Sequence, residues 1–386
     1  MKRVPGWLAT ILGATLLAAC GGNASPPSAP APSAASSAAA SASGAAASSS
    51  AKPVASGTVA SASAAAKPSA AGGGASPAAS GLVSLKVAHV PSTLFAPLYI
   101  AIDKGYMRQQ GINVDLTTVT AGQDAQAFLA NGQLDASVAG MSAATFNAIN
   151  QGLDVRIVGS MGVSPDNADP SALMVRSDLL DSGAVKGIAD LKGRKVVASG
   201  GVGATGSYYL AQLLAKANLT LGDVEVVNMG FPDMVAAFKS KAIDAGIPSA
   251  PFTTQILNDG TARIPDFGHL TPGVSGTGTI YGDHLLRKDR ALGQKFFDGL
   301  VQGAADVQGD KARSPENLDI LSKATKLPVD TLKTMALYNF KPDLAPDTAT
   351  YENMQKVFIQ AGVLKFQQPL PTDKVVDGEF SKNAKP

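Results

Sequence analysis

Strand signals alternate with helical segments over residues 85–251, and this alternation restricts the fold more than any other feature of the chain. Residues 85–90 alternate between apolar and polar side chains, as a half-buried strand does, and a helical segment from about Pro97 follows. Similar pairs continue to the strand signal at 155–158, and the pattern begins again at 195–198. Strands separated by helices predict right-handed crossovers and largely parallel sheets. We therefore expect an α/β fold.

The new start at 195–198 indicates a second lobe. We expect residues 81–177 to form the first part of lobe 1, residues 178–275 to form lobe 2, and residues 276–386 to return to lobe 1 as a helical C-terminal part. The helices expected there lie at 314–325, 328–338 and 347–361. Two α/β lobes place a ligand cleft between them, where strand C-termini and helix N-termini converge.

The first 20 residues have the layout of an export signal. Lys2 and Arg3 precede an apolar stretch, which is shorter than the roughly 20 apolar residues that a membrane-spanning helix needs. We expect residues 1–19 to be a signal peptide. The run 17–20, Leu-Ala-Ala-Cys, resembles the lipobox of bacterial lipoproteins. The resemblance implies cleavage before Cys20, lipid on its sulfur, and an acyl chain such as palmitate on the new amino terminus, whereas an ordinary signal peptide with a chance cysteine is the alternative.

Residues 20–80 connect this anchor to the folded part. Beyond Cys20 they consist almost entirely of Ala, Ser, Gly and Pro, with no acidic or aromatic residue. Such a segment cannot bury enough apolar surface to offset its chain entropy. We predict a disordered, lipid-anchored tether that spans about 45 Å as a flexible coil. The protein is therefore expected outside the cytoplasm, periplasmic or on the outer cell surface, and attached to a membrane.

Composition excludes several classes of function. Cys20 is the only cysteine, so the folded part has neither disulfides nor thiolate metal sites, and the three histidines are widely separated. Residues 81–386 carry 28 basic and 30 acidic side chains, a net charge of −2 that gives no electrostatic case for nucleic acid. We predict no metal site, no nucleic-acid partner and a monomer.

Six short segments, in a fixed order, resemble one family of transport proteins. They are 96–101 (APLYIA), 103–106 (DKGY), 111–114 (GINV), 131–135 (NGQLD), 190–193 (DLKG) and 242–246 (AIDAG). Together they resemble the periplasmic substrate-binding proteins for nitrate, sulfonates, taurine and thiamine-pyrimidine precursors. The resemblance implies a type II periplasmic-binding-protein fold whose lobes close on a small organic solute. It also implies delivery of that solute to an ABC permease and its ATPase.

The loops that follow the predicted strands are the candidate ligand-binding segments. Their hydroxyls donate and accept hydrogen bonds, their large apolar side chains pack on an apolar body, and a glycine lets the backbone approach a ligand. The candidate residues are Ser92, Thr93, Phe95, Asp124, Met141, Ser142, Gly203, Thr205, Ser207, Phe231 and Ser249. Helix capping is the alternative role for each hydroxyl. These loops contain no Arg or Lys, so we expect a neutral or zwitterionic solute, or an anion held only by helix dipoles.

Gly201, Gly203 and Gly206 have the spacing of the dinucleotide-binding fingerprint. The next strand, however, ends at Asn228, where that fingerprint requires an acidic residue to bind a ribose hydroxyl. We therefore predict no cofactor, and we expect the glycine-rich loop to form one wall of the solute cleft.

Two other functions remain open at the level of sequence. One is an enzyme on the same fold, a lyase or hydrolase, which requires a general acid or base in the cleft; Asp124 and Asp233 are the candidates. Ser142 after Gly140 resembles a nucleophile elbow, but the second glycine of that motif is missing. The other function is the solute-sensing lobe of a signalling system. We expect binding without catalysis.

Overall fold

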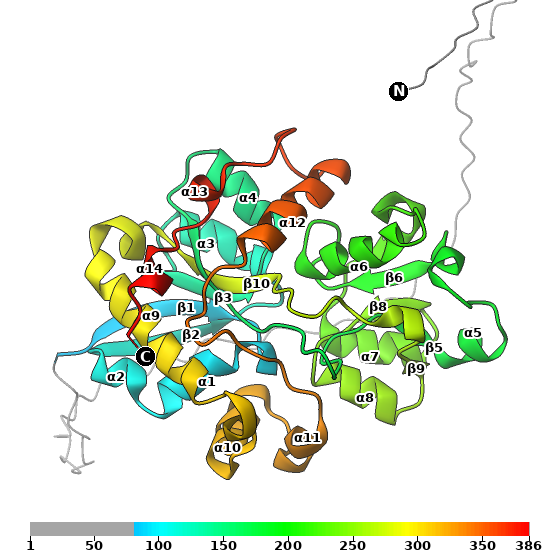
Figure 1. Cartoon of the computed structure of the whole chain (residues 1–386), viewed down its shortest axis with the longest axis horizontal. Helices are drawn as coiled ribbons and strands as arrows, with labels where there is room; N and C mark the ends of the chain where they lie inside the picture. The colour runs from blue at the N-terminus through cyan, green and yellow to red at the C-terminus, as the bar shows by residue number, and fades with distance from the viewer. Residues whose placement is uncertain (1–80, 386) are drawn as a thin grey trace, which may run out of the picture. The chain divides into compact units, whose positions relative to one another are not determined.

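The computed structural model describes residues 81–385, which form two five-stranded sheets with helices on both faces of each (Figure 1). The prediction of a two-lobed α/β fold is confirmed. The predicted signal peptide, the lipid on Cys20 and the tether lie outside the described residues. Within residues 81–385, no helix is both long enough and apolar enough to cross a bilayer.

The sheet of lobe 1 has the strand order β2-β1-β3-β10-β4. Its strands are β1 (Val83–His89), β2 (Ile112–Thr118), β3 (Ala136–Gly140), β4 (Arg156–Ser160) and β10 (Thr277–Tyr281). β1 is parallel to β2 and β3, as predicted, whereas β10 runs antiparallel to β3 and β4. The sequence did not reveal β10, because all five of its residues are buried and a strand buried on both faces lacks the polar alternation.

Two helical layers cover the two faces of this sheet. Alternate side chains of β1 point to opposite faces, so Val87 joins one apolar cluster and Ala88 joins the other. The first layer contains α1 (Ala96–Asp103), α2 (Tyr106–Gln109), α9 (Arg290–Ala305), α10 (Pro315–Thr325) and α11 (Val329–Thr334). The second layer contains α3 (Gln126–Ala130), α4 (Ala143–Asn150), α12 (Thr348–Gln360) and α13 (Thr372–Val375).

The helix predicted to begin at about Pro97 is divided into α1 and α2. Gly105 separates them with a φ of 80°, a left-handed conformation that interrupts a helix and that glycine adopts without strain. The three helices predicted for the C-terminal part are present as α10, α11 and α12. A final helix, α14 (Glu379–Lys382), packs against α9 and β4.

The sheet of lobe 2 has the strand order β7-β6-β8-β5-β9. Its strands are β5 (Met174–Arg176), β6 (Lys195–Ala198), β7 (Glu225–Val227), β8 (Ala245–Ile247) and β9 (Ala262–Arg263). Its helices are α5 (Ser177–Asp181), α6 (Thr205–Ala215), α7 (Phe231–Lys239) and α8 (Phe252–Asn258). Because β5 pairs with β8 and β9, the chain enters the second sheet before residue 178, the boundary expected from the sequence.

Short helical turns complete the two lobes. They are η1 (Thr93–Phe95), η2 (Gly122–Ala125), η3 (Ile188–Leu191), η4 (Leu221–Asp223), η5 (Asp266–Gly268), η6 (His284–Lys288) and η7 (Gly309–Arg313). The chain passes between the sheets twice, through residues 161–173 and 264–276. These two crossovers are the covalent links between the β-sheets.

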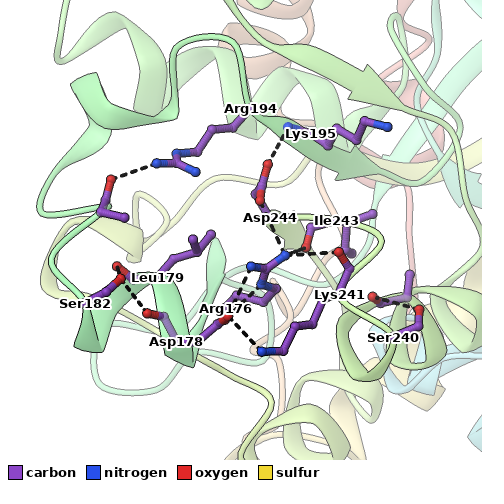
Figure 2. Close-up of polar contacts among 12 residues, drawn as sticks. Arg176, Asp178, Leu179, Ser182, Arg194, Lys195, Ser240, Lys241, Ile243 and Asp244 are labelled. Carbon is purple, nitrogen blue, oxygen red and sulfur yellow. Dashed lines mark hydrogen bonds and ion pairs between the residues drawn. The ribbon is translucent and has the colours of Figure 1, made fainter.

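A charged network around Arg176 holds the end of the second sheet at which β8 begins (Figure 2). The Arg176 guanidinium donates to both carboxylate oxygens of Asp178, at 2.9 and 3.2 Å, and to the carbonyl of Lys241 at 3.0 Å. The Lys241 ammonium donates to Asp178 at 3.0 Å. Hydrogen bonds from Arg176 and Lys241 lower the pKa of Asp178 to about 2. The cavity described next lies at the opposite end of the sheet, beyond the C-termini of β6 and β8.

Candidate ligand-binding cavity

A cavity with a volume of about 90 Å³ lies between the two lobes. A single buried water needs only about 10–15 Å³, so the cavity has room for a small organic molecule. Its walls are the loops that follow β1, β2, β3 and β4 in lobe 1 and β6, β7 and β8 in lobe 2. This is the arrangement that strand C-termini produce in open α/β sheets.

The lobe 1 wall combines apolar side chains with hydroxyl and amide groups. Phe95 and Met141 are buried and present apolar surface, while Ser92 and Ser142 follow β1 and β3. Gln123, in η2, contributes the side-chain amide. Ser142 is also the N-cap of α4, because its Oγ accepts a hydrogen bond from the Thr145 N–H at 3.4 Å.

The lobe 2 wall is built in the same way. Ser199 and Thr205 follow β6, Phe231 begins α7, and Ser249 follows β8. The ring of Phe231 stacks on Phe252 with centroids 5.9 Å apart. α4, α6 and α7 all begin at the cavity, and helix N-termini favour electron-rich atoms of a ligand.

None of the described residues that line the cavity is Asp, Glu, Lys, Arg or His. Polar character comes from Ser, Thr, Tyr and Gln side chains and from the backbone. The phenol of Tyr338 stays protonated, because burial raises its pKa. An ionised ligand would therefore find no opposite charge in the wall, and burying an unpaired charge costs several kcal/mol.

Direct hydrogen bonds join the lobes around the cavity. The Ala143 N–H at the start of α4 donates to the Gly203 carbonyl at 2.7 Å. The Thr205 hydroxyl is within hydrogen-bonding distance of the carbonyls of Met141 and Gly276, at 3.1 and 2.6 Å. The Gly276 N–H donates to the Tyr209 hydroxyl at 2.9 Å.

Four further residues form what we call the hydroxyl cluster: Ser92, Ser171, Ser249 and Tyr338. The Tyr338 hydroxyl lies 2.6 Å from the Ser171 hydroxyl and 2.7 Å from the Ser249 hydroxyl. The Ser92 hydroxyl lies 3.3 Å from that of Ser249 and donates to the Ala250 carbonyl at 3.0 Å. Tyr338 and Ser92 pack with lobe 1, whereas Ser249 follows β8 of lobe 2, so the cluster crosses the cleft.

The structure brings seven of the eleven predicted ligand-binding residues to the cavity wall. They are Ser92, Phe95, Met141, Ser142, Thr205, Phe231 and Ser249. Several of these also have structural roles, as the capping alternative anticipated: Ser142 caps α4, and Ser92 caps η1 by accepting from the Leu94 N–H. Their contact with a ligand remains a prediction.

The other four predicted residues lie outside the wall. The Asp124 carboxylate accepts from the Ala121 N–H at 2.9 Å and so caps η2. Ser207 is fully buried and accepts from the N–H groups of Gly203 and Ala204. Gly203, at a φ of 92°, lies against Ala143 at the contact between the lobes. Thr93, the first residue of η1, is buried and does not line the wall.

Sequence reasoning missed several lining residues, among them Ser164, Ser171, Ser199, Thr277, Tyr209 and Tyr338. Ser199 immediately precedes the glycine-rich loop, so the rule that ligand-binding residues lie in the loops after strands could have identified it. Ser164, Ser171 and Thr277 lie in or beside the two crossovers, which have no strand–loop–helix signature. Tyr338 enters from the helical C-terminal part, and only the tertiary fold brings it to the cleft.

The motifs of the alternative functions occupy structural positions. The Ser142 hydroxyl lies 3.3 Å from that of Thr145 in addition to capping α4. His89 contacts Tyr99, His269 contacts Asp169 and His284 contacts Asp135, and none of these histidines lines the cavity. In residues 81–385, no group of three or more His, Cys, Asp and Glu side chains is arranged to hold a metal ion.

The sequence is related to known binding proteins across both lobes. The family model described as "NMT1/THI5 like" matches residues 92–267. A protein of Brucella abortus (strain 2308), named as a binding protein, is 32% identical over 241 residues, which cover 61% of this chain and 70% of the relative. The chain belongs to the NMT1/THI5-like family. The matched segment of this family member includes Ser92, the glycine-rich loop and Ser249, so it spans both walls of the cavity.

Two further proteins, each named for the solute that it binds, are similar to this NMT1/THI5-like protein. The riboflavin-binding protein RibY of Chloroflexus aurantiacus is 25% identical over 228 residues, which cover 58% of this chain and 62% of RibY. The alkanesulfonate-binding protein SsuA of Xanthomonas axonopodis pv. citri has the same fold, with a TM-score of 0.59 at 19% identity, over 76% of this chain and 98% of SsuA. The predicted type II periplasmic-binding-protein fold is confirmed.

Proposed function

We propose that this protein is an extracytoplasmic solute-binding lipoprotein that captures a small organic molecule between its lobes and delivers it to an ABC importer. The observation that carries the proposal is the cavity walled by both lobes and free of charged side chains among the described residues. Each lobe contributes hydroxyls and a phenylalanine ring, Phe95 from lobe 1 and Phe231 from lobe 2. Neither wall alone encloses a ligand.

Capture follows from lobe closure. A ligand that contacts both walls stabilises only the arrangement in which the walls are together, so binding shifts the lobes toward closure. The hydrogen bonds from Ala143 to Gly203 and within the hydroxyl cluster add to the closed arrangement. The crossovers 161–173 and 264–276 are the segments that change conformation when the lobes separate.

The solute is neutral or zwitterionic. A strong anion would be buried without a cation, and the helix N-termini at the cavity supply only partial charges. Phe231 and Phe95 provide faces for an apolar or ring-shaped body, while serine and threonine hydroxyls bind its polar edge. The riboflavin bound by RibY and other uncharged heterocycles have this chemistry.

Membrane attachment and partners complete the proposal. We infer that Cys20 carries the lipid and that residues 20–80 let a monomeric binding part reach an ABC permease and its ATPase. A Cys20→Ser variant, expressed beside wild type, is expected to leave the membrane fraction. Recovery of that variant in the membrane fraction at the wild-type level contradicts the lipid anchor.

Calorimetric titration of the purified protein tests solute binding. The panel contains riboflavin, thymine, benzamide, taurine, an alkanesulfonate and nitrate. We expect at least one neutral or zwitterionic compound to bind, and sulfonate and nitrate to bind more weakly. A Phe231→Ser variant should lose about ten-fold or more in affinity, since burial of an aromatic face contributes about 1.5–3 kcal/mol.

The matched control is Phe128→Ser, which changes a Phe that is 47% exposed and lies outside the cavity wall. Its affinity should equal that of wild type. The proposal is contradicted if no panel compound binds, or if nitrate and sulfonate bind most tightly.

A further inference from the structure

Gln123 lies in η2, in the loop after β2, and among the described residues of the cavity wall it is the only one with a side-chain amide. The Asp124 carboxylate accepts from the Ala121 N–H at 2.9 Å. The Gln126 amide donates to the Gly122 carbonyl at 3.3 Å. The half-buried Gln123 amide, in contrast, has no hydrogen-bond partner among the described residues, and neither its Oε1 nor its Nε2 is enclosed. A ligand can therefore reach both atoms.

The Gln123 amide extends toward lobe 2. The loop after β6 lies opposite, because a Cβ added to Gly200 would be only 3.2 Å from the Gln123 Oε1. The Gly200 N–H already donates to the Asn228 side chain at 2.9 Å. Ser199, the residue before Gly200, lines the cavity, and its half-buried hydroxyl has no partner among the described residues. Free polar groups from both lobes thus lie where these two loops meet.

Several hydroxyls of the wall, in contrast, already use their donor within the protein. The Thr205 hydroxyl donates to the Gly276 carbonyl at 2.6 Å. The Ser92 hydroxyl donates to the Ala250 carbonyl at 3.0 Å, and the other members of the hydroxyl cluster bond to one another. A hydroxyl that donates to the protein can only accept a hydrogen bond from a ligand, whereas the Gln123 amide keeps both a donor and an acceptor free.

We propose that Gln123 selects a solute that carries an uncharged amide, lactam or imide edge. The inference rests on the proposed function and names the chemical class of its solute. A side-chain amide presents a donor and an acceptor side by side, so it forms two parallel hydrogen bonds with a group that presents an acceptor and a donor side by side. An isolated carbonyl oxygen satisfies only one of them. Phe231 lines the same cavity and provides a face for the ring that carries this edge.

Calorimetric titration of wild type, Gln123→Met and the control Gln133→Met tests the selection. The probe is the compound among riboflavin, thymine and benzamide that binds wild type most tightly. It is compared with its N-methylated derivative, which is 3-methylriboflavin, 1,3-dimethylthymine or N,N-dimethylbenzamide. Wild type should bind the probe about ten-fold or more tightly than the derivative, because the derivative has no N–H to donate.

Gln123→Met should bind the probe about ten-fold or more weakly than wild type does, since both hydrogen bonds are lost. The ratio of its affinities for the probe and for the derivative should also shrink several-fold. Gln133 is exposed and lies outside the cavity wall, so Gln133→Met should match wild type in both affinities. The ligand-free Gln123→Met should melt at the wild-type temperature, because the amide has no partner among the described residues.

The inference is overturned if wild type binds the derivative as tightly as the probe, a result that needs no variant. It is also overturned if Gln123→Met keeps the wild-type affinity, loses affinity for probe and derivative equally, or melts several degrees below wild type, which would make the role of the amide structural. A loss of affinity in Gln133→Met as large as in Gln123→Met has the same meaning. If taurine binds and none of the three probes does, the proposed function stands and this inference fails; if no panel compound binds, both fail.

Discussion

Replacing Tyr338 with phenylalanine removes one hydroxyl from the centre of the hydroxyl cluster and keeps the ring. The ring packs in the apolar core of lobe 1, and the hydroxyl lies 2.6 Å from Ser171 and 2.7 Å from Ser249. Ser249 keeps its contact with Ser92, whereas Ser171 loses the hydroxyl contact that Tyr338 supplies. Two neutral hydrogen bonds contribute about 1–3 kcal/mol together.

This cost falls on the arrangement with the lobes together, because Ser249 belongs to lobe 2 and Tyr338 packs with lobe 1. The closed population should therefore fall about 5- to 150-fold relative to the open one. Small-angle X-ray scattering of the ligand-free variant should give a larger radius of gyration than wild type. Affinity for a panel compound should fall by the same factor when ligand-free wild type is mostly open, and only by the drop in the closed fraction when it is mostly closed.

Tyr281→Phe is the matched control. Its hydroxyl is buried and donates to the Gly293 carbonyl at 2.8 Å, entirely within lobe 1. This variant should lose thermal stability without changing the radius of gyration or the affinity. If Tyr338→Phe and Tyr281→Phe behave alike in scattering and binding, the hydroxyl cluster does not hold the lobes together and the reasoning is refuted.

Three further perturbations follow from the structure. Burial lowers the pKa of His89 below 6.5, so as the pH drops the unfolded chain binds a proton before the folded chain does, and stability should fall below pH 6.5. Thermal melts from pH 8 to pH 5 should show this fall in melting temperature in wild type and in the control His269→Gln, whose site is exposed. The fall should be smaller in His89→Gln. The pKa of Asp178 is about 2, so its contribution to stability is present above pH 3.8 and is lost as the pH falls through 2. Arg176→Gln should raise the pKa of Asp178 toward 3.8 in an NMR titration. An unchanged pKa would show that Arg176 does not lower it. Gly203→Ala should lower the melting temperature, because a left-handed φ of 92° costs other residues about 1–3 kcal/mol and the new Cβ would lie 3.0 Å from that of Ala143. A melting temperature equal to that of wild type would contradict the close approach of Gly203 to Ala143.

Local sequence patterns were sufficient for much of the fold. Strands such as β1 and β2 were predictable because buried and exposed side chains alternate along part of each strand, and α10 and α12 were predictable from their apolar spacing. β5 and β10 were not predictable. Each is short or fully buried, and each owes its place to pairing with strands distant in sequence. Such non-local pairing leaves no periodic signal in the strand itself.

The residues of the cavity wall also divide into those that the sequence could predict and those that it could not. Ser92, Met141, Thr205 and Ser249 follow strands, so the rule that ligands bind beyond strand C-termini located them. The rule does not separate a hydroxyl that faces the cleft from one that caps a helix, as Ser207 shows. The rule also does not identify the lining residues that come from the crossovers or from the C-terminal part.

The most direct test of a neutral solute held between two lobes is a crystal structure of the protein with the panel compound that binds most tightly. We predict the compound between the lobes, in contact with Phe231 on one side and with the loop of Ser92 on the other. A compound bound to one lobe only, or held by an Arg, Lys, Asp or Glu side chain, would contradict the account.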